Sequence, residues 1–343
     1  MKAVVIREHG DLEVLRFEEV PVPVLHEDET LVRVRAIGIN NLDTWVRRGV
    51  PGHRFPLPII PGSDASGIVE SAGSAVRSAK AGDAVVLSPG VSCGLCRQCL
   101  AGVDNLCRQY GILGESRDGT CAEFVAVPER NILPKPSGLS FEEAASIPLV
   151  FLTAWHMVGV RAAVRPGEWV LIRAAGSGVG SAALQIAKMH GATVIAAART
   201  KEKVEQAAAL GADFTIESSS QDTYEEVRRL TSKRGVDVVV EHVGEATWES
   251  SVRSLARGGR LVICGATTGA DVKINLRVLF FKSLSLLGST MGSKAELIDV
   301  FSHVAAARLR PIVHEVLPFE AVAEAHRMLA ERRVFGKLIL RLD

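Results

Sequence analysis

A regular alternation of short apolar strands and helices fills the middle of the chain and limits its fold most narrowly. The expected strands are apolar along their length: Trp169 to Ala174, Thr193 to Ala198, Phe214 to Ile216, Val236 to Glu241, Arg260 to Gly265 and Leu284 to Gly288. Helical patterns separate most of them. Strands that are apolar on both faces belong in a parallel sheet covered by helices on both sides. We therefore predict an α/β fold, with a doubly wound, six-stranded parallel sheet in residues 151–288.

The first third of the chain has a different pattern. From Met1 to about Pro128, short apolar alternations are interrupted by Gly and Pro, which is typical of strands in an irregular, mainly antiparallel barrel. The tail from Ser293 to Asp343 ends in a short strand, Lys337 to Leu340, and could return to this barrel. We predict a second domain that combines residues 1–150 with residues 289–343.

Charge and hydropathy exclude two classes of partner. Forty basic and 39 acidic residues leave a net charge of +1, which does not suit a nucleic-acid binder or a protein attracted to anionic membranes. The apolar run at the N-terminus stops at Arg7, and no stretch approaches the ~18 apolar residues of a membrane span. We expect a cytoplasmic protein that acts on a small molecule, with no nucleic-acid or membrane partner.

A glycine-containing segment, Ala174 to Gly180, follows the first strand of the parallel sheet and opens a helix. Glycines let a backbone approach a ligand closely, and a helix N-terminus offers free N–H groups to a pyrophosphate. A strict G-x-G-x-x-G motif would need glycine at Ala175 and Ser177, so a purely structural turn is the alternative. We predict dinucleotide binding, with contacts from Gly176, Ser177, Gly178, Val179 and Gly180.

The end of the second strand bears on the choice of dinucleotide. An acid about 20 residues past the glycines commonly holds the ribose hydroxyls of NAD. Here the sequence reads Ala-Arg-Thr-Lys from residue 198, and the first acid is Glu202. Basic side chains suit a ribose 2′-phosphate, although a solvated helix start is the alternative. We predict that NADP(H) is preferred over NAD(H), with Arg199, Thr200 and Lys203 as contacts.

Four of the six cysteines lie between Cys93 and Cys107, with two, two and seven residues between successive members. This spacing lets four thiolates surround one ion tetrahedrally. Ferredoxin-type runs begin similarly, but there the next cysteine comes sooner and precedes proline. We predict one structural zinc per chain in a lobe of about residues 90–110, because four sulfur ligands leave no open position; the ligands are Cys93, Cys96, Cys99 and Cys107.

Together these landmarks resemble the medium-chain dehydrogenases/reductases, the superfamily of zinc-containing alcohol dehydrogenases and quinone oxidoreductases. The resemblance includes the segments Ala36 to Asn40, Pro61 to Gly67 and Ala81 to Asp83, followed by the cysteine lobe and the glycine loop. It implies a GroES-like catalytic domain wrapped by both chain ends, a Rossmann domain, and hydride transfer in the cleft between them.

The chain departs from this family at the catalytic zinc. By motif, the three ligand positions are Asn40, Ser63 and Leu149, which are poor ligands or none. Asp43 and Asp64 could offer oxygens, but two carboxylates do not build a three-ligand site. We therefore predict that no catalytic zinc is bound, as in the quinone oxidoreductase branch, which the segment Gly38 to Gly49 resembles.

Candidate catalytic residues follow from this difference. Asn40 has an amide that could polarise a carbonyl group, while Asp43 and Arg47 are four apart on one face of an expected helix. Alternatively, Asn40 or Asn41 caps this helix and the other two form an ordinary surface ion pair. We take Asn40, Asp43 and Arg47 as the candidates.

The resemblance also implies residues that line the cofactor. Thr153 is expected beside the nicotinamide, and the others follow the ends of parallel strands: His242, Val243, Cys264, Gly265, Ala266 and Ser289. We interpret His242 as a lining residue, since a histidine at a strand end is often structural. An apolar stretch, Leu276 to Leu287, contains the sixth strand at a sheet edge and predicts a homodimer or homotetramer.

The combined features predict an NADP(H)-dependent reductase of a quinone, an activated alkene or a carbonyl compound. The first alternative is an alcohol dehydrogenase that oxidises alcohols with NAD(P). The second alternative is a nucleotide-binding protein without turnover.

Overall fold

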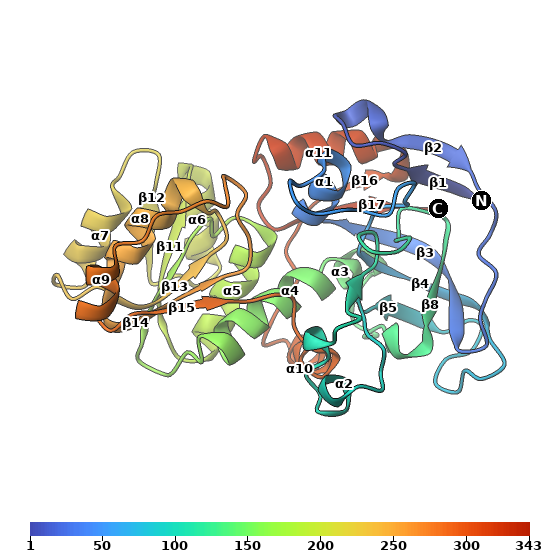
Figure 1. Ribbon diagram of the computed structural model, residues 1–343, viewed down its shortest axis with the longest axis horizontal. Helices are drawn as coiled ribbons and strands as arrows, with labels where there is room; N and C mark the ends of the chain where they lie inside the picture. Colours follow the sequence, from blue (N-terminus) through green and yellow to red (C-terminus); the bar gives the residue numbers. More distant parts are fainter. The chain divides into compact units, whose positions relative to one another are not determined.

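The computed structural model describes residues 1–343, which form two compact units (Figure 1). The barrel unit consists of Met1–Leu149, Ser293–Ala306 and Arg310–Asp343. The sheet unit consists of Val150–Gly292 and Ala307–Leu309. Three parts that the sequence pattern assigned to the barrel domain therefore lie in the sheet unit: Val150, residues 289–292 and Ala307–Leu309.

The sheet unit contains six strands in the order β12-β11-β10-β13-β14-β15, and every neighbouring pair is parallel. Their bounds are β10 (Trp169–Ile172), β11 (Thr193–Ala198), β12 (Phe214–Glu217), β13 (Val236–Glu241), β14 (Leu255–Ile263) and β15 (Ser285–Gly288). Helices connect or flank them: α5 (Gly178–Met189), α6 (Lys201–Ala209), α7 (Thr223–Leu230), α8 (Glu245–Ser254) and α9 (Leu276–Phe281). The central strands β10 and β13 have almost no exposed apolar side chains, as a sheet covered on both faces requires. The predicted doubly wound parallel sheet is confirmed.

The barrel unit is built on a sheet in the order β16-β17-β3-β4-β5-β9, with β8 paired to β3. Its strands are β3 (Glu29–Ile39), β4 (Asp64–Ala72), β5 (Ala84–Leu87), β8 (Phe124–Pro128), β9 (Ile132–Pro134), β16 (Val313–Pro318) and β17 (Lys337–Arg341). A separate two-stranded antiparallel sheet is formed by β1 (Lys2–Val5) and β2 (Arg16–Glu19). All pairs in the larger sheet are antiparallel except β16 with β17. Because Leu338 of β17 pairs with Ile39 of β3, the C-terminal strand lies beside a strand from the start of the chain (Figure 1).

The helices of the barrel unit are short. They are α1 (Asn41–Arg48), α2 (Arg97–Leu100), α3 (Phe141–Ala145), α10 (Lys294–Ala305) and α11 (Val322–Ala330), and α4 (Pro148–Trp155) begins in this unit and ends in the other. The apolar core beneath the sheet includes Ile37, Ile39, Leu338 and Leu340. The strand pairing that buries these side chains also brings the end of β3 beside the start of β17.

Three features of the structure go beyond the elements expected from the sequence. Helix α4 begins at Pro148, because proline suits the first turn of a helix, and it continues as a π-helical turn over His156–Arg161. The apolar stretch at Leu276 to Leu287 is not only a strand: α9 occupies its first half, where Asn275 accepts hydrogen bonds from the amides of Arg277 and Val278. Strand β16 was not among the strands expected from the sequence.

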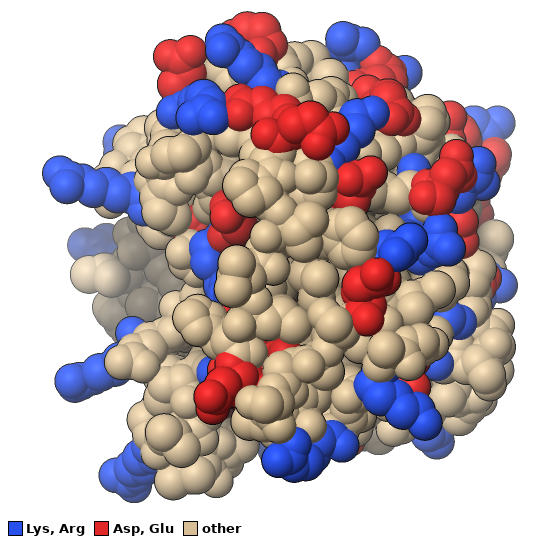
Figure 2. All heavy atoms as spheres, turned by 90° about the vertical axis from the view of Figure 1, so that its right-hand side faces the viewer, with Lys and Arg blue, Asp and Glu red and all other residues tan.

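No helix combines the length and the apolar composition that crossing a bilayer requires. On the face drawn in Figure 2, basic and acidic side chains are interspersed and neither sign forms an extended patch.

Candidate functional site

The glycine loop lies at the carboxyl edge of the parallel sheet, between β10 and α5. Ser177 is the N-cap of α5, and its hydroxyl oxygen accepts a hydrogen bond from the Gly180 amide at 2.9 Å. A Cβ atom added to Gly180 would meet the carbonyl oxygen of Ala174 at 2.4 Å, so this position requires glycine. The loop therefore packs tightly against the helix start, whose remaining free N–H groups suit a phosphate group.

Two unpartnered polar atoms lie at the same edge of the sheet. His242 follows β13, and its Nε2 lies 2.9 Å from the Ser177 hydroxyl, while its buried Nδ1 has no partner. Burial lowers the pKa of His242, so the imidazole is held neutral. Ser289 follows β15, and its buried hydroxyl also lacks a partner. Buried polar atoms of this kind fit a ligand that supplies the missing hydrogen bonds.

The other predicted cofactor residues occupy neighbouring strand ends. Val243 follows β13, and Cys264, Gly265 and Ala266 follow β14; all are half-buried. Thr153 is 5% exposed on α4, with its hydroxyl 4.0 Å from the sulfur of Met291, just beyond β15. The structure thus brings residues from distant parts of the sequence to one edge of one sheet.

Arg199 and Thr200 follow β11 and are exposed. Thr200 is the N-cap of α6, where its hydroxyl accepts a hydrogen bond from the Lys203 amide at 3.4 Å. No acidic side chain precedes Glu202 at this strand end. The loop therefore presents a guanidinium, a hydroxyl and a helix N-terminus, a set that fits a phosphate monoester.

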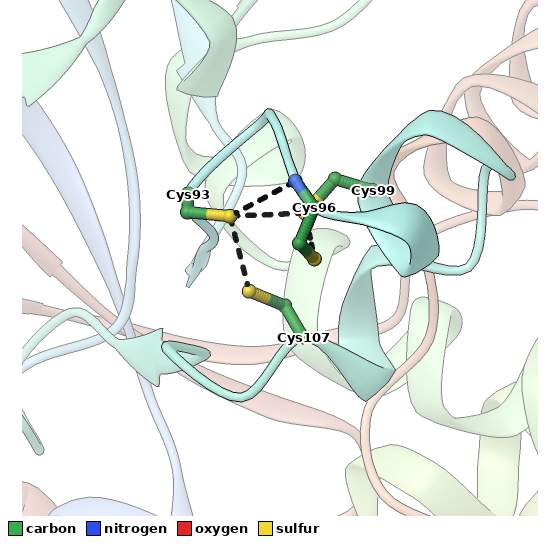
Figure 3. A group of neighbouring side chains, drawn as sticks. All are labelled: Cys93, Cys96, Cys99 and Cys107. Carbon is green, nitrogen blue, oxygen red and sulfur yellow. Dashed lines mark hydrogen bonds between the residues drawn. The ribbon is translucent and has the colours of Figure 1, made fainter.

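The four clustered cysteines converge in the loop between β6 (Gly90–Val91) and β7 (Gly111–Ile112) (Figure 3). The sulfur of Cys93 lies 3.8 Å from that of Cys99 and 3.6 Å from that of Cys107. The sulfur atoms of Cys96 and Cys99 are 3.5 Å apart. A regular tetrahedron of thiolates about 2.3 Å from a zinc ion has edges of about 3.8 Å. The spacing fits one tetrahedral ion and is too long for disulfide bonds.

The loop backbone also favours thiolates. The amides of Cys96 and Gln109 donate to the sulfur atoms of Cys93 and Cys107 at 3.4 and 3.3 Å. Hydrogen bonds from backbone amides, first that of Leu95, lower the pKa of Cys93 to about 6. The thiolate is the form that binds metal, so the residues present fit a zinc ion with all four positions filled by sulfur.

A third group of polar residues lies inside the barrel unit, where β3, β4 and β17 meet. The Lys337 ammonium donates to the Ile39 carbonyl at 2.9 Å, to Asn40 Oδ1 at 2.6 Å and to Asp64 Oδ2 at 3.1 Å. Asn40 Nδ2 donates to Asp64 Oδ2 at 3.0 Å and to the Gly38 carbonyl at 3.1 Å. We call Lys337, Asn40 and Asp64 the internal cation cluster.

Asp43 borders this cluster, whereas Arg47 does not. Asp43 lies in the first turn of α1, where its Oδ2 accepts a hydrogen bond from the Asn40 backbone amide at 2.7 Å. Burial raises the pKa of Asp43 to about 7. Arg47 lies at the other end of α1 and donates to the Gly10 carbonyl at 2.8 Å, with Asp11 3.7 Å away. Both side chains are 1% exposed and do not form the surface ion pair considered from the sequence.

Comparison with known proteins relates both units to one family. Residues 26–137 match the family described as alcohol dehydrogenase GroES-like domain, and residues 178–306 match zinc-binding dehydrogenase. An alcohol dehydrogenase of Geobacillus stearothermophilus is 32% identical over 345 residues, which is 100% of each chain. Human quinone oxidoreductase is 28% identical over 352 residues, 100% of this chain and 98% of the human one. A crystal structure of an NAD-dependent alcohol dehydrogenase is 50% identical, with a TM-score of 0.96 and 100% coverage of each chain.

The chain belongs to the medium-chain dehydrogenase/reductase superfamily. It is an oxidoreductase of this superfamily, and its barrel unit contains the GroES-like domain. The predicted resemblance is therefore confirmed, and so is the predicted combination of a GroES-like barrel with a Rossmann-type sheet.

The three positions expected for the ligands of a catalytic zinc make contacts within the protein. Asn40 is in the internal cation cluster; the Ser63 hydroxyl donates to the Leu113 carbonyl at 2.8 Å; and Leu149 contributes only its backbone amide, which donates to Asp64 Oδ1 at 2.9 Å. The four cysteines are the one group of three or more His, Cys, Asp or Glu side chains placed to hold a metal ion.

Sequence reasoning did not identify Lys337, and it considered Asp64 only as a metal ligand. A weak signal for Lys337 exists, because it is a lysine followed by the apolar run Leu338 to Leu340 in the final strand. Its partners could not be inferred, since they depend on the pairing of β17 with β3.

Proposed function

We propose that this oxidoreductase is an NADP(H)-preferring reductase that delivers hydride to a quinone, an activated alkene or a carbonyl compound without a catalytic zinc. The observation that supports this most strongly is the internal cation cluster: Asn40 Oδ1 and Asp64 Oδ2 accept hydrogen bonds from the Lys337 ammonium, and Asp64 Oδ1 accepts one from the Leu149 amide. Relatives named alcohol dehydrogenase and quinone oxidoreductase both agree with hydride transfer.

The proposed cofactor contacts follow from the carboxyl edge of the sheet. The pyrophosphate would be held by Gly176, Ser177, Gly178, Val179 and Gly180, and the nicotinamide half would be lined by Thr153, His242, Val243, Cys264, Gly265, Ala266 and Ser289. The 2′-phosphate would contact Arg199, Thr200 and the start of α6 at Lys203. When bound, NADPH supplies the hydride, and the protein side chains supply orientation and exclusion of water.

The proposed metal content is one structural zinc, held by Cys93, Cys96, Cys99 and Cys107. Four thiolates leave no coordination position for water or substrate, so this ion would stabilise its lobe and take no part in the reaction.

The roles proposed for the candidate catalytic residues differ. Both amide hydrogens of Asn40 are used within the protein, so we assign it to positioning. Asp43 is the candidate proton-holding group, because its pKa lies near 7 and its Oδ1 has no partner. Arg47 faces Gly10 and Asp11, so we assign it no part in proton transfer.

Alcohol oxidation is the second candidate, favoured by the 50% identical protein named NAD-dependent alcohol dehydrogenase. Steady-state turnover separates the two. We expect NADPH oxidation with quinones, enones or ketones as acceptors, unchanged after mild treatment with EDTA. Activity confined to alcohols with NAD⁺, and lost on the same treatment while the sulfur-bound zinc remains, would contradict the proposal. An absence of turnover with every acceptor and alcohol would favour the non-catalytic alternative.

We further propose assembly of two or more copies through the β15 edge of the sheet unit. β15 is the last strand of the sheet, and the neighbouring α9 exposes Leu276, Phe280 and Phe281 by 65%, 61% and 65%. An open edge beside exposed apolar side chains is a common basis for sheet extension between subunits.

A further inference from the structure

We propose that Lys337 is a positioning residue that also takes the place of a metal ion: its ammonium fixes the orientation of Asn40 and Asp64 and keeps divalent cations out of the oxygen atoms that it occupies. This inference rests on the proposed function as a reductase without a catalytic metal ion. It names Lys337 as the residue that keeps the metal ion out.

The surroundings of Lys337 use its whole bonding capacity. It is the first residue of β17, and its side chain is 4% exposed. An ammonium has three protons and no acceptor. The three oxygen atoms within 2.6–3.1 Å belong to Ile39, Asn40 and Asp64, one for each proton. The position is therefore filled by one fully coordinated cation.

The ammonium determines which way the Asn40 amide points. Because Lys337 only donates, the carbonyl oxygen of the amide must face it, and the NH₂ group must face the other way. There the two amide hydrogens meet the Gly38 carbonyl and Asp64 Oδ2. A flipped amide would set its NH₂ group against the ammonium. Lys337 thus holds Asn40 in one of its two orientations.

The charge of the cluster depends on the same residue. Asp64 is 0% exposed, and its Oδ2 receives both the ammonium and the Asn40 amide. Asp43 is the second carboxyl group nearby; the Lys337 charge opposes the rise in its pKa, and the Asp64 charge adds to it. The internal cation cluster contains one cation and one carboxylate, and the bordering carboxyl group of Asp43 is partly protonated near neutral pH. The cluster and Asp43 together are therefore close to neutral. A divalent ion cannot enter without bringing like charges together in a buried site.

Removal of the ammonium leaves a different site. The oxygen atoms of Ile39, Asn40 and Asp64 are hard ligands, of the type that Mn²⁺ and Mg²⁺ prefer over thiolates. The buried carboxylate of Asp64 would then have no counterion. We expect the Lys337→Met chain to accept a divalent cation in the vacated position.

Electron paramagnetic resonance of added Mn²⁺ provides the test, on zinc-loaded chains whose thiolates are already occupied. We expect no tightly bound Mn²⁺ in the unsubstituted protein and one per chain in Lys337→Met. Lys337→Arg keeps the charge and should bind none. The double variant Lys337→Met/Asp64→Asn lacks the carboxylate and should also bind none. Lys135→Met is the matched control, because Lys135 donates to two backbone carbonyls and to no carboxylate.

Kinetics separates positioning from a merely structural role. In Lys337→Met we expect kcat to fall about tenfold or more while KM for NADPH changes less than about twofold, since misplacement of polar groups affects the reacting geometry and not the nucleotide site. Lys337→Arg should recover most of the lost kcat.

The outcomes distinguish this inference from the proposed function. A Lys337→Met chain that folds only when Mn²⁺ is supplied supports the inference as much as direct binding does. A folded Lys337→Met chain that binds no Mn²⁺, or one that fails to fold with and without Mn²⁺, overturns it and leaves the metal-free reductase intact. A second zinc in the unsubstituted protein, lost together with activity, overturns the proposed function itself.

Discussion

The Lys337 ammonium lies 3.1 Å from a carboxylate oxygen of Asp64, although the two residues are 273 positions apart in the chain. Their side chains are 4% and 0% exposed. The pair connects the first residue of β17 with the first residue of β4, across the intervening β3. Because burial removes the water that would solvate a lone charge, each member of the pair depends on the other.

A double-mutant cycle should reveal this dependence. We expect Lys337→Met and Asp64→Asn each to lower the free energy of unfolding by about 3–5 kcal/mol, since each leaves an uncompensated buried charge. The double variant should lose clearly less than the sum of the two. Urea unfolding of the unsubstituted chain, the two single variants and the double variant measures these free energies.

The ion pair of Lys188 with Asp213 is a suitable comparison. Its members are 34% and 35% exposed, and water screens the charges of a pair that is exposed to this extent. We expect a coupling energy of about 1 kcal/mol or less for that cycle. Equal coupling in the two cycles would contradict the special role of burial at Lys337.

The raised pKa of Asp43 makes stability depend on pH. The pKa is about 7 in the folded chain, against about 3.9 for an unfolded aspartate. The folded state therefore binds the proton more tightly, and stability should fall as pH rises from about 4 to about 7. The full difference corresponds to about 4 kcal/mol.

Asp43→Asn should remove this contribution, so the substituted chain gains stability relative to the original as pH rises from 5 to 8. Denaturant unfolding at both pH values measures the change. Asp213→Asn is the control, because an ion pair with Lys188 lowers the pKa of Asp213 and its effect should be constant over this range. A pH-independent effect of Asp43→Asn would refute the raised pKa.

Arg199 should decide the cofactor preference. One or two charge-assisted bonds to a 2′-phosphate contribute ~1.5–3 kcal/mol, so NADPH should bind roughly ten- to a hundredfold tighter than NADH. Arg199→Ala should erase most of this difference, whereas Arg229→Ala, an exposed arginine on α7, should preserve it. Fluorescence titration with both nucleotides measures the affinities, and equal values in the unsubstituted protein would contradict the proposal.

The features that sequence alone could predict depend on residues near one another in the chain. The four cysteines span 15 positions, and the glycine loop follows its strand directly, so spacing carries the information. The internal cation cluster needs the register of β17 on β3 and of β3 on β4, which joins residues far apart. Local spacing can also mislead. The helical spacing of Asp43 and Arg47 predicted that both lie on one helix face, but the Arg47 guanidinium donates a hydrogen bond to the Gly10 carbonyl and does not contact Asp43.

Metal analysis should find one zinc per chain. Four thiolates hold it, and no second group of three ligating side chains is present. Cys96→Ser should lower the zinc content and the thermal stability of the lobe, because a closed sulfur site contributes folding energy. Cys121→Ser is the control: Cys121 is buried away from the cluster, and it should leave zinc content unchanged. Two zinc ions per chain would contradict the proposal.

The edge of the sheet unit should determine the oligomeric state. β15 has a neighbour on one side only, and Leu276, Phe280 and Phe281 are exposed on α9, the helix that precedes it in the chain. Burial of these side chains against a second copy would remove apolar surface from water and complete the edge. We expect light scattering at micromolar concentration to give the mass of a dimer or a larger even assembly. We expect Phe281→Glu to shift this mass toward that of the monomer.

Leu95→Glu is the matched control, since Leu95 is 82% exposed on the cysteine lobe. A monomer mass for the unsubstituted protein, or the same loss of assembly in both variants, would rule out this edge as the interface.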